Sequence, residues 1–136
     1  MPLLHQYIFL IPLVVMVLTE ITKVIVAYFR TGSWHAGIFK PGGMPSSHSA
    51  FVTSLLMIVA RKTGLDSVEF AIAFVFAAIV WYDAMSVRRE VGLQAEMLNR
   101  LQNWTKFSER VGHSFLQVIV GIMFGAVVTQ IGIWLS

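Results

Sequence analysis

Three apolar stretches dominate this sequence, and each is long enough to cross a lipid bilayer. They cover residues 7–29, 68–87 and 115–135. At about 1.5 Å per residue, helices of this length match the roughly 30 Å hydrocarbon core of a membrane. Hydrophobic residues make up 57% of the chain and charged residues only 12%, a balance that excludes an ordinary soluble domain. The sequence therefore predicts an integral membrane protein.

A fourth apolar run, residues 49–60, is short for a full crossing. Ser46 and Ser47 follow Pro45 and are good helix N-cap residues, so a helix that begins there is longer than the apolar run itself. We therefore expect an all-α integral membrane bundle of about four transmembrane helices, which forms a single domain over residues 1–136.

The stretch 88–111 is the most polar part of the chain, yet its apolar residues recur every three or four positions. They are Val91, Ala95, Leu98, Leu101, Trp104, Phe107 and Val111. This spacing predicts an amphipathic helix at the membrane interface.

Four crossings place both termini on one side of the membrane and the loops 30–47 and 88–112 on the other. The two loops carry seven cations (Arg30, Lys40, Arg88, Arg89, Arg100, Lys106 and Arg110), whereas the first side has Arg61 and Lys62. The positive-inside rule therefore predicts an inner (cytoplasmic) membrane protein whose two long loops face the cytoplasm. Because the cations are dispersed, the net charge of +3 favours lipid or phosphate as a partner, and we expect no nucleic acid.

The chain has no cysteine and only four scattered histidines, so it offers few of the side chains that usually bind metal ions. We expect neither a metal nor a cofactor. His5 and His35 are interpreted as interfacial residues. The chemistry must come from the remaining ionisable and hydroxyl side chains.

Glu20 and Lys23 are ionisable residues inside the first apolar stretch, where charge is costly and usually functional. They lie three positions apart, so they share a helix face and can neutralise each other. One interpretation is an ion pair that only fixes packing. In the other, Lys23 lies near the cytoplasmic end of its helix and directs its ammonium group at an anion.

The segment KPGGMPSSHSA, residues 40–50, joins flexible glycines to the start of an apolar helix. Gly42 and Gly43 allow backbone angles that other residues avoid, and a helix N-terminus binds anions. The two histidines His48 and His113 both precede apolar helices, and Asp83, Arg88 and Arg89 lie near the end of the apolar stretch 68–87. These residues could form the active site of a phosphomonoesterase that uses no metal. Lysine and arginine would bind the phosphate dianion, one histidine would attack phosphorus and the other would protonate the leaving oxygen.

These residues resemble a family, the divergent membrane branch of the phosphatidic acid phosphatase type 2 superfamily, which is related to vanadium-dependent haloperoxidases. GGMPSSHSA at residues 42–50 resembles the signature of this branch. Tyr82-Asp83-Ala84, Val87-Arg88-Arg89, Gly92, Gln94-Ala95-Glu96 and Leu98-Asn99 resemble its YDAxGVRRxxGxQAExLN stretch. With Gly112-His113 and Gly121, the resemblance runs from about Lys23 to Gly121.

The resemblance implies a phosphatase of membrane lipid phosphates that acts through a phosphohistidine intermediate. His113 would be the nucleophile and His48 the general acid. The substrate phosphate would be bound by Lys23, Gly43, Ser46, Ser47, Arg88 and Arg89. Members of the branch are associated with phosphatidylglycerophosphate, and a polyprenyl or other lipid phosphate is the alternative substrate.

One position departs from the pattern. The branch has a carboxylate four residues after the nucleophilic histidine, whereas this chain has Gln117. An amide keeps a hydrogen bond to the ring but loses the electrostatic help of a carboxylate. Asp83 or Glu109 would be candidates to supply that support, or the chain would be a catalytically silent lipid-phosphate binding member.

Two further alternatives stay open at this point. Glu20, Lys23 and Asp83 could instead line an ion path in a small transporter, although the apolar stretch 115–135 offers only Thr129 and Gln130 for it. Gly121 and Gly125 form a GxxxG pattern, which permits either a homodimer or close packing inside one bundle.

Overall fold

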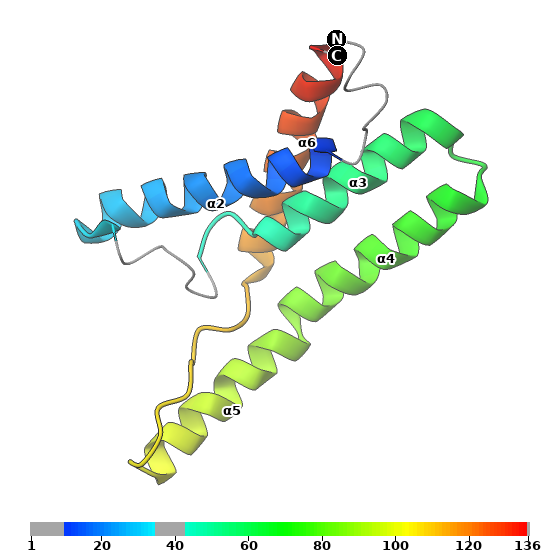
Figure 1. The fold of residues 1–136 in the computed structure, drawn as a ribbon. Helices are drawn as coiled ribbons and strands as arrows, with labels where there is room; N and C mark the ends of the chain where they lie inside the picture. Colours follow the sequence, from blue (N-terminus) through cyan, green and yellow to red (C-terminus); the bar gives the residue numbers. More distant parts are fainter. Residues whose placement is uncertain (1–9, 35–42, 136) are drawn as a thin grey trace.

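The computed structural model describes residues 10–34 and 43–135, and every regular element in these ranges is a helix. The helices are α2 (Leu10–Thr31), α3 (Ser47–Thr63), α4 (Val68–Met85), α5 (Val87–Leu101) and α6 (Phe115–Trp134) (Figure 1). This confirms the prediction of an all-α membrane bundle. The predictions for His5, His35, Lys40 and Gly42 lie outside the described residues.

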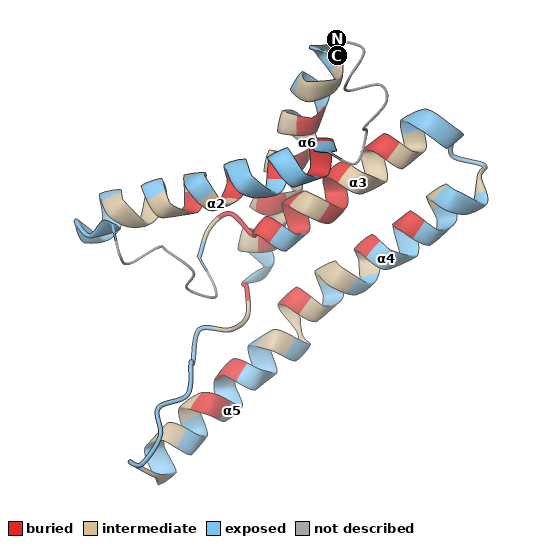
Figure 2. Cartoon of the chain, viewed as in Figure 1, coloured by how far each residue is buried: buried red, intermediate tan, exposed pale blue. Residues whose placement is uncertain are grey.

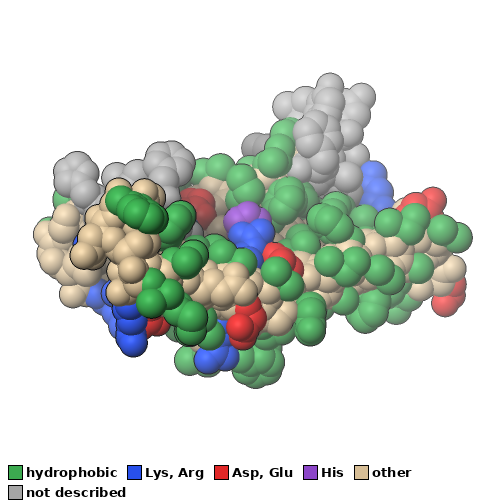
Figure 3. Space-filling view, turned by 90° about the horizontal axis from the view of Figure 1, so that it is seen from below, with side chains coloured by type: hydrophobic (Ala, Val, Ile, Leu, Met, Phe, Trp, Pro, Cys, Tyr) green, Lys and Arg blue, Asp and Glu red, His purple; other side chains and the backbone are tan. Residues whose placement is uncertain are grey.

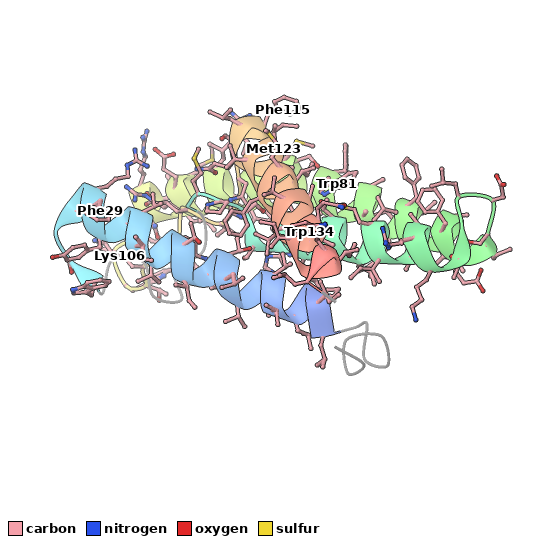
Figure 4. All side chains as sticks on the ribbon, turned by 90° about the horizontal axis from the view of Figure 1, so that it is seen from above. Phe29, Trp81, Lys106, Phe115, Met123 and Trp134 are labelled. Carbon is pink, nitrogen blue, oxygen red and sulfur yellow. The ribbon has the colours of Figure 1, made fainter. Side chains whose placement is uncertain are left out.

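Three helical stretches of the described chain are long and apolar enough to cross a membrane: α2, α4 together with its continuation α5, and α6. Their outward side chains are exposed apolar groups, such as Phe115, Met123 and Trp134 on α6 (Figure 4). The expected fourth span is the helix α3, which has 17 residues and a length of about 26 Å. It is the shortest of the bundle's four long apolar helices, and it differs from the others in composition.

Helix α3 lies at the centre of the bundle, in contact with α2, α4 and α6. Its buried residues are mostly small or carry hydroxyl groups, including Ser49, Ala50, Thr53 and Ser54 (Figure 2). Small side chains let neighbouring helix backbones approach closely, which is how helices pack when lipid provides no hydrophobic drive. Because α3 is surrounded by protein, it does not need the lipid-facing apolar surface of its neighbours.

The GxxxG pattern on α6 packs against α3 of the same chain. A Cβ added to Gly121 would lie 2.5 Å from the Ser46 carbonyl oxygen, and one added to Gly125 would collide with the backbone of Ala50. Both glycines are buried in this contact. The pattern is therefore used for close packing inside one bundle, and a homodimer stays a prediction without support from it.

Replacing Gly125 with alanine should lower the stability of the bundle by about 1–3 kcal/mol, because the added methyl group overpacks the α3–α6 contact. Gly132→Ala is the matched control on the same helix, since its Cβ would meet Ile11 at an ordinary 3.5 Å. Thermal unfolding in detergent measures both variants. Equal unfolding temperatures would contradict the packing described above.

The amphipathic helix predicted for residues 88–111 is shorter in the structure. Helix α5 continues the direction of α4 (Figure 1) and ends at Leu101. Beyond it, the Gln102 side-chain oxygen accepts hydrogen bonds from the N–H groups of Trp104 and Thr105, at 2.9 and 3.0 Å. Such side-chain bonds compete with the helix for backbone groups. The prediction was therefore wrong for the last ten residues, whose periodic apolar side chains do not share a helix.

Candidate active site

The sequence-predicted site residues gather where α3 and α6 begin and α4 ends. Helix α2 contributes Lys23, the start of α3 contributes Ser47 and His48, and His113 immediately precedes α6. Arg88 comes from the first turn of α5. In the space-filling view, histidine and Lys or Arg side chains lie next to each other on one face, among hydrophobic groups (Figure 3).

The conformation of the loop before α3 determines the residue at which this helix begins. Gly43 has a φ of +96°, which favours glycine. Ser46 is the N-cap, and its hydroxyl accepts from the Ser49 N–H at 3.4 Å and pairs with the Ser49 hydroxyl at 2.9 Å. Ser46 is fully buried, so its side chain serves the cap. The Ser47 and His48 positions then form the helix end, where backbone N–H groups favour an anion.

Lys23 is a buried cation held by a carboxylate on its own helix. Its Nζ lies 2.7 Å from Oε2 and 2.9 Å from Oε1 of Glu20. Its aliphatic part lies beside the loop, since a Cβ on Gly43 would be 3.3 Å from Lys23 Cδ. The ammonium group is therefore fixed between α2 and the loop that begins α3.

A second ion pair orders the α4–α5 junction. Arg88 Nε donates to Asp83 Oδ2 at 2.7 Å, and both side chains are partly exposed. This contact spans the helix boundary at Ser86. It directs the Arg88 guanidinium group toward the cluster, where it interacts electrostatically with both His48 and His113.

The chain returns from α5 to place His113 beside the end of α4. Gly112 lies so close to the backbone of Arg88 and Arg89 that an added Cβ would be 2.5 Å from Arg89 N. The backbone N–H of His113 then donates to the Ala84 carbonyl oxygen at 3.1 Å. Gly112 is thus required for close approach, and this approach fixes the position of His113.

The His113 ring is held by the residue one turn below it. Its Nδ1 lies 3.3 Å from Gln117 Oε1. The same oxygen accepts from the Ser114 N–H at 3.0 Å, and Ser114 and Gln117 form a capping box at the start of α6. With Oε1 facing the ring, Nδ1 carries the proton and Nε2 keeps its lone pair.

The environment of His113 favours the neutral ring. Burial lowers the pKa of His113 below its ordinary value. The hydrogen bond that the ring donates to Gln117 opposes this effect, whereas the nearby charges of Lys23, His48 and Arg88 add to it. A nucleophilic imidazole must be unprotonated. The lowered pKa keeps His113 in that form at neutral pH and somewhat below it.

The two carboxylates expected to compensate for Gln117 are engaged elsewhere. Asp83 binds Arg88, and Glu109 accepts from Asn99 Nδ2 at 2.8 Å, on the segment that returns from α5. The hydrogen-bond partner of the His113 ring is Gln117 itself. The structure therefore gives no support to compensation by Asp83 or Glu109.

Lys23, His48, Arg88 and His113, four of the residues that the sequence proposes for the site, thus lie near enough to one another for their charges to interact. Arg89 is exposed, and its backbone lies against Gly112. Two elements of the site were not predicted from the sequence. They are the interaction of Glu20 with the Ser47 side chain and the Ala84 carbonyl group that holds His113. The spacing of Glu20 and Lys23 was a signal for the first, whereas a backbone carbonyl leaves no trace in a sequence. In the described ranges, no group of three His, Cys, Asp or Glu side chains could hold a metal.

The model of the Divergent PAP2 family matches residues 4–128 of this chain. The chain belongs to the Divergent PAP2 family. A relative within curated proteins, the uncharacterized membrane protein YuiD of Bacillus subtilis (strain 168), is 33% identical over 153 residues, with 96% of each chain covered. No solved structure matches the chain. Membership in the Divergent PAP2 family confirms the resemblance seen in the motifs, and the relative and the apolar helices together establish an integral membrane protein.

Proposed function

We propose that this chain is a phosphatase of membrane lipid phosphates, with phosphatidylglycerophosphate as the favoured substrate and a polyprenyl or other lipid phosphate as the alternative. The observation that carries the proposal is the convergence of two histidines, a buried lysine and an arginine from four separate segments. Family membership supports the same reaction class. Two imidazoles can supply a nucleophile and a general acid for phosphoryl transfer, and two cations can stabilise the charge on the phosphate oxygens.

In the proposed first step, Nε2 of His113 attacks phosphorus while Lys23 and Arg88 neutralise the phosphate oxygens. The P–O bond to the lipid alcohol breaks, and His48 gives its proton to the departing oxygen. In the second step, His48 removes a proton from water, which attacks the phosphohistidine. The P–N bond then breaks, phosphate leaves and His113 returns to its neutral form. We place this reaction on the cytoplasmic side, because the positive-inside rule puts both loops of the site there.

The test is release of phosphate from detergent-solubilised protein that is given a panel of lipid phosphates. The panel includes phosphatidylglycerophosphate, phosphatidic acid and a polyprenyl phosphate, with a soluble phosphate monoester as the comparison. We expect turnover of at least one lipid phosphate, with phosphatidylglycerophosphate fastest. Hydrolysis of the soluble monoester alone would contradict a lipid substrate.

A catalytically silent lipid-phosphate binding protein is the second candidate function, and Gln117 is the observation that favours it. The amide orients the His113 ring but stabilises positive charge on it less than a carboxylate would, because the amide carries no negative charge. Silence across the whole panel, together with retained binding of a lipid phosphate, would favour this candidate.

A further inference from the structure

Glu20 is a carboxylate within an apolar helix, where an ion pair brings little net stability. Its two oxygens hold the Lys23 ammonium group at 2.7 and 2.9 Å. The desolvation of two charges at such a position largely offsets their attraction, so a packing role is better served by apolar residues. Its placement beside the site therefore calls for a functional explanation.

The contacts of Glu20 extend beyond its own helix. Its carboxylate also interacts with the Ser47 side chain at the first residue of α3, and with the charge of His48. Lys23, held by Glu20, lies in turn against Gly43. Through these contacts Glu20 joins α2 to the loop that begins α3 and to the imidazole of His48 that follows this loop.

His48 stands among charges of both signs. Helix α2 supplies Glu20 and Lys23, α4 supplies Asp83 and α5 supplies Arg88, while His113 faces it from the segment before α6. Asp83 is bound to Arg88 as Glu20 is to Lys23, each at 2.7 Å, but Glu20 also contacts the side chain of Ser47, the residue before His48. A general acid must hold its proton until the leaving oxygen develops charge. Burial and the charge of Arg88 disfavour the protonated His48 ring, and Glu20 is the larger of the two negative influences that oppose them.

We propose that Glu20 is a positioning residue of the site, which fixes the Lys23 ammonium group beside the loop that begins α3 and supplies negative charge that favours the protonated form of His48. A carboxylate in contact with the phosphate dianion would repel it, so Glu20 acts through Lys23 and His48. This inference rests on the proposed phosphatase function.

The test is the variant Glu20→Gln, which keeps the size and the hydrogen-bonding oxygen of the side chain but removes its charge. The upper pH limb of kcat should move about one unit lower, which reduces kcat about tenfold on the alkaline side and little on the acid side. KM should rise, because Lys23 loses its anchor. Glu20→Asp, which restores the charge, should return the upper limb toward its original pH.

Glu96→Gln is the matched control, since Glu96 also pairs with a cation on its own helix, Arg100 at 2.5 Å, and lies on α5 among exposed residues. Its pH profile should equal that of the unaltered chain. A purely structural Glu20–Lys23 pair would instead give a lower unfolding temperature and an equal loss of rate at every pH. That result, or an unchanged profile in a folded Glu20→Gln protein, overturns the inference.

Titration of His48 by NMR, in the unaltered protein and in Glu20→Gln, tests this inference independently of the proposed function. In Glu20→Gln the His48 ring should lose its proton at a pH about one unit lower, whether or not the protein turns over a substrate. An unchanged titration overturns the inference. A shifted titration in a protein without phosphatase activity supports the coupling of Glu20 to His48 and contradicts the proposed function alone.

Discussion

Replacing His113 with alanine should lower turnover of the lipid phosphate by about 10⁴-fold or more, because the proposed reaction then has no nucleophile. The ring occupies a buried position fixed by its own backbone bond to Ala84 and by Gln117. The backbone bond survives the substitution. The fold and the cation cluster of Lys23 and Arg88 should therefore persist, and an inorganic phosphate analogue such as tungstate should still bind.

His48→Ala is the matched control, since it removes the other imidazole of the cluster. The proposed general acid matters less when the leaving group needs no proton, so the loss in His48→Ala should shrink for a substrate with a nitrophenol leaving group. The loss in His113→Ala should not shrink. A denaturing gel of protein incubated with radiolabelled lipid phosphate should show labelled protein with His113 and none with alanine. Unchanged turnover in a folded His113→Ala protein would refute the mechanism.

Much of this architecture could be predicted because membrane helices are specified locally. Length and hydropathy locate α2, α4 and α6 within a few residues, and the hydroxyl residues after Pro45 mark where α3 begins. The central place of α3 could not be predicted in this way, because it depends on which helices its small residues contact. The α6 glycines show the same limit: their spacing predicts close packing, whereas the contact with Ser46 and Ala50 is known only from the structure.

The candidate site was predictable as a set of residues but not as a set of contacts. Motifs and helix ends identify Lys23, His48, Arg88 and His113. The partner of the His113 ring could not be chosen from the sequence, because Asp83, Glu109 and Gln117 were all available to it. The choice depends on side-chain hydrogen bonds between residues that are not neighbours in sequence. The bond from Asn99 to Glu109, for example, engages one of the three candidates. Asn99 also accepts from the Phe107 N–H at 2.9 Å, and these bonds hold the chain that follows the early end of α5.

Replacing Gln117 with glutamate should raise the turnover of this chain, by as much as roughly 10⁴-fold if the ring gains the full effect of a buried carboxylate. The new carboxylate side chain would have the same length as the amide and would accept the same two hydrogen bonds, from His113 Nδ1 and Ser114 N–H. The capping box also survives, since glutamate fills its third position as well as glutamine does. The substitution therefore changes charge with little effect on the start of α6.

The pH profile gives a second readout of the same variant. A carboxylate beside the ring favours its protonated form, so Gln117→Glu should raise the pKa of His113. The nucleophile must be neutral, and the acid limb of kcat/KM should therefore move to higher pH while the maximum rate increases.

Gln117→Leu is the control, because it removes the hydrogen bond without adding charge and should lower the rate. Activity confined to the glutamate variant would mean that the site is intact and that the amide at position 117 has silenced it. Equal rates and equal acid limbs in Gln117→Glu and the unaltered chain would contradict the role of this position in orienting His113.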